Sequence, residues 1–237
     1  MFFKKKQKSS FLDKYIRGGY LPASSGVDMR QFVDWIKKYS NSLTVKNIFE
    51  IGANFAQDAD FLSQEFNISP KNVYVFEAHP DLYKAITKLH QFNAYNYAVY
   101  NENKEVNFNI LPINVQNTGL SSILNLTKYD TNSVKVKAVR MDTFMQEHDI
   151  SNIDFLKLDV EGCNFEVLEG FGDRLSDIKC IHLEAEHALY IDYKEKNYLY
   201  TDIERLLKKN GFELVFFQRY TLQSDSFWVQ KQFVRDN

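Results

Sequence analysis

Acidic residues that follow apolar runs are the part of this sequence best suited to chemistry. FLKLDVEG brings Lys157, Asp159 and Glu161 to the end of one run, and IHLEAEH brings Glu184 and His187 to the end of another. Carboxylates near a histidine suit proton abstraction or divalent cation binding, and their mutual repulsion makes the arrangement costly otherwise. We therefore predict Asp159, Glu161 and His187 as catalytic residues. The alternative is that Asp159 and Glu184 hold a divalent cation such as Mg²⁺, and we favour the arrangement without metal. The plainer alternative is that Asp159 or Glu161 only caps the following helix.

A glycine and a further glutamate point to a nucleoside ligand. Gly52 ends the run IFEI, where it allows a tight turn and lets a ligand approach main-chain N–H groups. Glu77 follows the run VYVF, 25 residues later, and a carboxylate there suits a ribose diol. Gly52 alone would fit an ordinary turn, but together the two favour an adenosine-containing ligand. The dinucleotide fingerprint GxGxxG is absent because Asn54 and Gln57 replace two glycines, which disfavours a nicotinamide- or flavin-dependent oxidoreductase.

The elements that must position these residues alternate between strands and helices. Strands joined by helices form βαβ units, so we expect an α/β fold with a parallel sheet and helices on both faces. The carboxyl ends of parallel strands share one edge of the sheet, where ligands bind. The acidic residues are therefore predicted to meet at that edge. The predicted strands are 45–51, 73–76, 94–100, 153–158 and 180–184, and the predicted helices are 80–91, 142–149, 164–171 and 200–210.

Two pairs of segments depart from this alternation. Residues 106–111 and 134–139 alternate apolar and polar side chains with no room for a crossover helix, which predicts an antiparallel pair. Residues 212–217 and 226–231 predict a hairpin after the last helix.

Composition and the first 45 residues bound the class of protein. The chain has 237 residues, 44% of them hydrophobic, and a formal net charge of -2, which is typical of a globular protein and gives no bulk electrostatic reason to expect a nucleic acid partner. An amphipathic stretch over 28–39 predicts a helix, so we divide the chain into an N-terminal helical extension, 1–44, and one domain, 45–237. No apolar stretch suits a signal peptide or a membrane span. We expect a cytoplasmic protein without an integral membrane segment, and an oligomer stays possible.

Several motifs occur in an order that resembles a known family. They are GANFAQDADFL, VYVFEAHP, NYAVYNENKEVNFNI, TGLSS, VKAVRMDTF and IDFLKLDVEGCNFEVLEG, within about residues 45–187. This series resembles the FkbM-type methyltransferases, a branch of the class I S-adenosylmethionine-dependent enzymes, and KLDVEG is its most distinctive part. The resemblance implies a Rossmann-like, seven-stranded, mostly parallel sheet whose terminal strand is antiparallel. It also implies S-adenosylmethionine at the carboxyl edge and O-methylation of sugar or natural-product hydroxyls.

The resemblance also assigns residues to the cofactor and leaves the acceptor open. It implies that Gly52 and Asn54 line the methionine and ribose side, that Glu77 holds the ribose hydroxyls, and that Asp159 lies near the methyl group. A nucleotide-linked or polymer-linked sugar is the preferred acceptor, while N-methylation at the same donor site and a non-catalytic nucleoside-binding module are alternatives. The full predicted cofactor-binding set is Glu50, Gly52, Asn54, Glu77, Ala78, Ala98, Ser122 and Asp159.

The chain departs from the usual family pattern at two positions. Ala56 stands where a second glycine is usual, and Asn164 stands where an acidic residue is more usual. Alanine is small enough to preserve the turn unless its φ must be positive.

Overall fold

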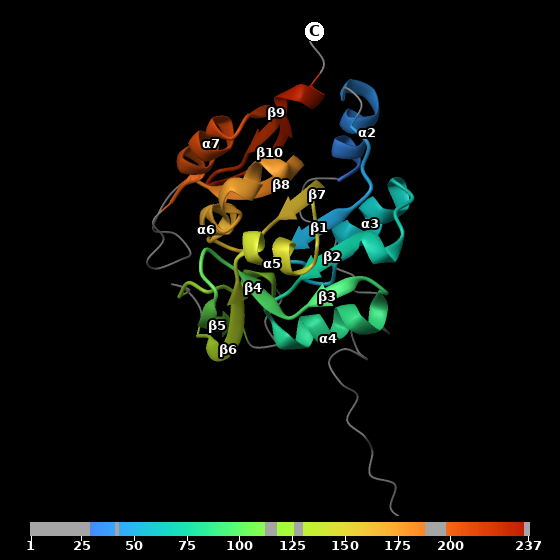
Figure 1. Cartoon of the computed structure of the whole chain (residues 1–237). Coiled ribbons are helices and arrows are strands. Elements are labelled where there is room, and N and C mark those ends of the chain that lie inside the picture. Colours follow the sequence, from blue (N-terminus) through green and yellow to red (C-terminus); the bar gives the residue numbers. More distant parts are fainter. Residues whose placement is uncertain (1–28, 41–42, 112–117, 126–129, 188–197, 235–237) are drawn as a thin grey trace, which may run out of the picture.

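The computed structural model describes residues 29–40, 43–111, 118–125, 130–187 and 198–234 (Figure 1). Among these residues the larger sheet has seven strands, in the order β3-β2-β1-β7-β8-β10-β9. Neighbouring strands run parallel except β10, which is antiparallel to both β8 and β9. The predicted mostly parallel sheet with an antiparallel last strand is confirmed. Its strands are β1 (Ile48–Ile51), β2 (Val73–Phe76), β3 (Asn93–Tyr95), β7 (Ile153–Leu158), β8 (Ile178–Glu186), β9 (Phe212–Arg219) and β10 (Gln223–Gln230).

Helices cover both faces of this sheet (Figure 1). α2, α3 and α4 pack with Ile48 and Phe155 on one face, while α5, α6 and α7 pack with Phe49 and Leu156 on the other. No helix of the described residues is long and apolar enough to cross a bilayer. The helices are α2 (Arg30–Tyr39), α3 (Gln57–Glu65), α4 (Pro80–Leu89), α5 (Met141–Glu147), α6 (Asn164–Glu169) and α7 (Tyr200–Lys209), with short 3-10 turns at Pro70–Asn72, Thr118–Leu120, Gly172–Asp177 and Lys231–Phe233.

The described part of the N-terminal extension belongs to the same core. The helix predicted over 28–39 forms as α2, and Phe32, Val33 and Ile36 are buried with residues of β1 and β7. Ser40, just after the helix, forms an isolated bridge to Val234 near the other end of the described chain. The domain boundary at residue 44 stays a prediction.

Polar residues interrupt one face of the buried strands. All six residues of β7 are buried, because a parallel sheet covered by helices on both faces leaves no exposed side. On the face of α2 and α3, however, the apolar positions Ile48 and Phe155 are followed two residues later by Glu50 and Lys157. These side chains lie next to the carboxyl edge, where the strands carry charged groups as well as apolar core residues.

A small second sheet stands beside that edge. It consists of β4 (Tyr97–Val99), β6 (Asn132–Val139) and β5 (Lys104–Ile110), in the order β4-β6-β5. β5 and β6 are antiparallel, as predicted, and β4 joins β6 in parallel. The single strand predicted over 94–100 is wrong, because the chain changes sheets at Asn96. The Asn96 Nδ2 donates to the carbonyl oxygens of Glu77 and Ala78, at 2.8 and 3.0 Å, and so ties the break to the end of β2.

Candidate active site

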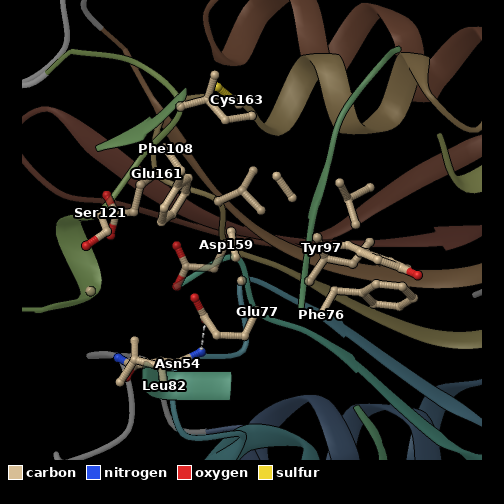
Figure 2. Close-up of a pocket in the computed structure, with 18 residues that line it drawn as sticks. Asn54, Phe76, Glu77, Leu82, Tyr97, Phe108, Ser121, Asp159, Glu161 and Cys163 are labelled. Carbon is tan, nitrogen blue, oxygen red and sulfur yellow. Dashed lines mark hydrogen bonds between the residues drawn. The ribbon is translucent and has the colours of Figure 1, made fainter. Parts of the chain in front are cut away.

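A pocket lies between the carboxyl edge of the main sheet and the small sheet. Its walls come from the loops after β1, β2 and β7, from β4, from Phe108 of β5 and from the loop that holds Ser121 (Figure 2). Its empty space is about 550 Å³ with the open solvent at its mouth included. The predicted cofactor residues that line it are Gly52, Asn54, Glu77, Ala78, Ala98 and Asp159.

Gly52 brings the ends of three neighbouring strands together. Its φ is 79°, in the left-handed region that favours glycine. A Cβ atom here would lie 1.8 Å from the carbonyl oxygen of Asp159, far inside van der Waals contact. The N–H groups of Gly52 and Ala53 both donate to the carbonyl oxygen of Phe76, at 3.0 and 3.1 Å. Only glycine therefore fits between the ends of β1, β2 and β7.

Replacing Gly52 by alanine is expected to lower the free energy of unfolding by about 2–4 kcal/mol, because the methyl group must displace Asp159 and the left-handed φ adds strain. Urea unfolding measures this loss, and calorimetric titration with S-adenosylhomocysteine should show loss of binding. Gly211→Ala is the matched control, since Gly211 also has a positive φ of 84° but its Cβ would meet only the movable Gln230 side chain, at 3.0 Å. The control should lose about 1–2 kcal/mol and keep its ligand affinity. A Gly52→Ala variant as stable as the wild type would contradict this account.

Glu77 presents a rigid carboxylate to the pocket. Its Oε2 accepts from the N–H of Asn54 and its Oε1 from the N–H of His79, both at 2.7 Å. The pKa of Glu77 is raised to about 7 in total: burial raises it most, the two hydrogen bonds offset part of the rise, and the charge of Asp159 adds to it. Figure 2 shows this carboxylate and that of Asp159 turned towards the same open space. Each Glu77 oxygen keeps a lone pair for a donor, so the group suits a pair of hydroxyls.

Asn54 adds an acceptor that has no partner in the protein. Its φ of 51° places it in the left-handed region, which asparagine tolerates better than most residues. Its Oδ1 is buried and accepts no hydrogen bond from the described residues. Leaving a buried polar atom unsatisfied costs about 1–3 kcal/mol. A ligand that donates a hydrogen bond to this wall would remove that cost.

Lys157 forms a buried cluster of charges behind the pocket. Its Nζ lies 2.9 Å from Asp159 Oδ2 and 3.5 Å from Asp58 Oδ2, and the residue is only 3% exposed. Burial lowers the pKa of Lys157, but the charges of Asp159, Asp58 and Glu50 outweigh it, so the net shift is upward and the ammonium stays charged. Glu50 accepts from the N–H of Ala59 at 3.0 Å, and burial followed by the charge of Asp58 raises the pKa of Glu50 well above its usual value.

The predicted Mg²⁺ site does not suit these contacts. Mg²⁺ requires several oxygen ligands around it, whereas Oδ2 of Asp159 already pairs with the Lys157 ammonium at 2.9 Å. Within the described ranges no group of three or more His, Cys, Asp or Glu side chains could hold a metal ion. Lys157 supplies at this point the positive charge that a metal would bring.

Glu161 lines the pocket in a strained backbone conformation, and a hydrogen bond from Ser122 holds its carbonyl oxygen. Its φ is 49°, which costs a residue other than glycine about 1–2 kcal/mol. The Oγ of Ser122 donates to the Glu161 carbonyl oxygen at 2.6 Å and is not part of the pocket wall, where Ser121 lies instead. Of the predicted cofactor residues, Ser122 and Glu50 therefore lie behind the lining. Strain of this kind is concentrated at functional sites.

His187 and Glu184, both predicted for the site, lie outside the pocket lining. The Nε2 of His187 is 2.9 Å from Ser224 Oγ, and its ring packs on Tyr200 with the centroids 5.0 Å apart. Burial and then the charge of Asp159 raise the pKa of Glu184 to about 8.

Sequence reasoning missed three residues of the site. Asp58 lies in the first turn of α3 and pairs with Lys157, while Tyr97 and Phe108 reach the pocket from the small sheet. The helix containing Asp58 follows Gly52 directly, so its position in the chain was a usable signal. No local pattern shows that the small sheet lies over the pocket.

The model of the Methyltransferase FkbM domain matches residues 50–214, which is 165 of the 237 residues. The chain belongs to the FkbM methyltransferase family. The expected S-adenosylmethionine-dependent methyltransferase class is thereby confirmed. No curated protein matches the chain.

Solved structures resemble this FkbM chain at low sequence identity. Methyltransferase FkbM from Methylobacillus flagellatus KT is 10% identical, with a TM-score of 0.47, over 83% of this chain and 50% of that one. TrmK from M. capricolum, solved with S-adenosyl-homocysteine, is 11% identical, with a TM-score of 0.46, over 87% of this chain and 70% of that one. LepI, solved with SAM, is 11% identical, with a TM-score of 0.44, over 95% of this chain and 53% of that one. The chain spans about half the length of the first and the third.

Both departures from the FkbM pattern have a structural consequence. Ala56 has a φ of 58°, so it adopts the left-handed conformation that glycine would accept freely, at a cost of about 1–2 kcal/mol. The turn forms nevertheless, with the N–H of Ala56 donating to the Ala53 carbonyl at 2.6 Å. Asn164 accepts from the N–H of Val160 at 3.2 Å and donates to the Glu184 carbonyl at 2.6 Å. An ionised acidic residue could not make the second bond, because it has no donor.

Proposed function

We propose that this FkbM-family protein transfers a methyl group from S-adenosylmethionine to a hydroxyl of a sugar, a glycan precursor or a related small molecule. The observation that carries the proposal is the Asp159 carboxylate at the pocket wall. Its Oδ2 is held by Lys157 at 2.9 Å, while its Oδ1 has no hydrogen-bond partner among the described residues. A carboxylate fixed in this way can orient a hydroxyl and take its proton.

The pocket residues fit the donor. Gly52 leaves room for a ligand against the main chain, Asn54 Oδ1 offers a buried acceptor, and Glu77 offers two carboxylate oxygens to a ribose diol. When bound, S-adenosylmethionine supplies a methyl group on a positively charged sulfur that becomes neutral on transfer. The carboxylates of Glu77 and Asp159 create a negative potential that favours a cation at this place.

We assign the proton transfer to Asp159 and its orientation to Lys157. As the acceptor oxygen forms its bond to the methyl carbon, Oδ1 of Asp159 takes the hydroxyl proton. Lys157 holds Oδ2 and so fixes the direction of the carboxylate. Glu161, on the same turn, borders the space left for the acceptor. We assign no role to His187, because its Nε2 is hydrogen-bonded to Ser224 Oγ.

The charge of the pocket favours a small acceptor over a nucleic acid. Its described lining includes Glu77, Asp159 and Glu161 but no lysine or arginine. A polyanion would be repelled there, whereas recognition of nucleic acid depends on cations at the phosphates. The sugar part of a nucleotide-linked sugar could enter while its phosphates stay outside. A cytoplasmic location stays a prediction.

Affinity for S-adenosylhomocysteine is expected to rise with pH. The pKa of Glu77 is raised to about 7, so its carboxyl group is protonated below that pH and accepts fewer hydrogen bonds. Below pH 7 the affinity for S-adenosylhomocysteine should therefore fall by up to about tenfold per pH unit. In the ligand-free fold the sign is opposite: the raised pKa means that ionising Glu77 lowers stability as pH rises from about 4.5 through about 7. Calorimetric titration between about pH 5.5 and 8 measures the affinity, and Glu77→Gln should bind weakly at every pH. A wild-type affinity that does not change with pH would contradict the role of Glu77.

The proposed function is tested by turnover. Purified protein receives S-adenosylmethionine with nucleotide sugars, free glycosides, primary amines or tRNA, and release of S-adenosylhomocysteine is measured. Release with a sugar, together with a methyl ether in the NMR spectrum of the product, would support O-methylation. Release only with amines or tRNA would replace it with N-methylation. Binding of the donor without release for any acceptor would favour a binding module.

A further inference from the structure

A second cavity lies beside the small sheet. It is bounded by β4, β6, the start of β5 and helix α5, which Figure 1 shows beside β4, and its empty space is about 710 Å³ with the open solvent at its mouth included. Ala98 and Phe108 line the cofactor pocket, whereas Lys137 and Ala138 line this cavity. Tyr97, which pairs with Lys137 between β4 and β6, borders both.

Aromatic rings form one wall of this second cavity. The rings of Phe144 and His148 stack with their centroids 4.1 Å apart. Tyr95 contacts Phe144 edge-on at 4.9 Å and stacks with Tyr97 at 5.9 Å. Tyr97, Phe144 and His148 line the cavity itself. Such a wall offers flat surfaces to a planar ring.

Two lysines at the same cavity are available to an anion. The Nζ of Lys137 lies 4.8 Å from the centre of the Tyr97 ring and within ion-pair distance of no carboxylate of the described residues. Lys104 pairs with Glu102 at 3.0 Å, but both side chains are largely exposed, at 42% and 60%. An exposed pair of this kind contributes about 0–1 kcal/mol and exchanges readily. The lining itself contains these two lysines and one acidic residue, Glu147.

Hydrogen bonds keep the polar end of the cavity in place. The Oδ1 of Asn103 accepts from the N–H of Arg140 at 2.7 Å, and its Nδ2 donates to Thr143 Oγ1 at 3.1 Å. Arg140 in turn donates to the carbonyl oxygen of Asn101 at 2.7 Å. These contacts join the start of β5 to the start of α5, so the two sides of the cavity keep their spacing without a ligand.

We propose that this second cavity binds a small organic anion that carries a flat ring, with the ring against Tyr97 and His148 and the anionic group between Lys104 and Lys137. A phosphorylated nucleoside has this chemistry. Asp159 lines the cofactor pocket and not this cavity, so the ligand does not take part in methyl transfer and the site is distinct from those of donor and acceptor. Tyr97 also borders the cofactor pocket, so the ligand would contact a wall of the donor site.

The test is calorimetric titration of the full chain with uridine 5′-monophosphate while S-adenosylhomocysteine is present in excess. The proposal expects saturable binding, with uridine and inorganic phosphate each at least about tenfold weaker, because one lacks the anion and the other lacks the ring. Lys137→Ala should raise the Kd by about tenfold. Lys135→Ala is the matched control, since Lys135 is on the same strand but pairs with Glu105 at 3.5 Å outside the cavity lining. It should leave the Kd unchanged.

Three results would overturn the proposal. The first is no binding of uridine 5′-monophosphate to the wild type at millimolar concentration. The second is an equal loss in the Lys137→Ala and Lys135→Ala variants, which would indicate a general effect of surface charge. The third is inorganic phosphate binding as tightly as the nucleotide, which would indicate an anion site without recognition of the ring.

Discussion

An Asp159→Asn variant is expected to bind S-adenosylhomocysteine nearly as the wild type does and to transfer methyl groups about 10²- to 10⁴-fold more slowly. Asparagine has almost the shape of aspartate, so the turn around Gly52 should keep its geometry. Its amide cannot take the acceptor proton, and the Oδ1 atom that is open in the wild type loses its basicity. Steady-state turnover with an acceptor identified in the turnover test gives kcat, and calorimetric titration gives the affinity for S-adenosylhomocysteine.

Asp58→Asn is the matched control for this loss. Asp58 faces the same ammonium group, at 3.5 Å, but does not line the pocket. The substitution therefore removes the same charge from the surroundings of Lys157 without removing a proton acceptor. If both variants lost kcat equally, the loss would come from the altered charge cluster. An Asp159→Asn variant with undiminished kcat would exclude Asp159 as the base.

The fold could be predicted because its strands carry their pattern locally. β2 and β7 are short, mainly apolar runs that are each followed by an acidic residue, and the structure places them at the predicted residues 73–76 and 153–158. The stretch from 94 to 100 shows where a local pattern fails. It has the residue types of one strand, but Asn96 bonds back to the end of β2 and divides it between two sheets. That division depends on contacts with Glu77 and Ala78, which periodicity does not report.

The site could be predicted to the extent that its residues follow strands. Gly52, Glu77 and Asp159 come directly after β1, β2 and β7, and the parallel arrangement alone brings such residues to one edge. His187 also follows a strand, but the antiparallel β10 beside it supplies Ser224 as a partner. The opposite case is Asp58, which is on a helix. Its contact with Lys157 depends on how α3 packs against the sheet, which the local sequence pattern does not report.

Replacing Lys157 by methionine is expected to lower the free energy of unfolding by about 3–5 kcal/mol. Methionine fills a similar volume, but it leaves the carboxylates of Asp58 and Asp159 close together with no cation between them. Lys157 is 3% exposed, so water cannot replace its charge. The variant should also lose kcat, because Asp159 Oδ2 no longer has the partner that fixes its direction. Urea unfolding measures the stability, and turnover measures the second effect.

Lys179→Met separates the loss of a lysine pair with a buried carboxylate from the loss of this cluster. Lys179 lies 2.6 Å from Asp154 Oδ1, but Asp154 also accepts hydrogen bonds from the N–H of Lys46 at 2.7 Å and from Asn152 Nδ2 at 2.7 Å. Its carboxylate stays satisfied, so this control should lose about 1–2 kcal/mol and keep kcat. Adding Asp58→Asn to Lys157→Met removes one stranded carboxylate and should restore part of the lost stability. A double variant no more stable than Lys157→Met would mean that Asp58 is not coupled to the Lys157 charge.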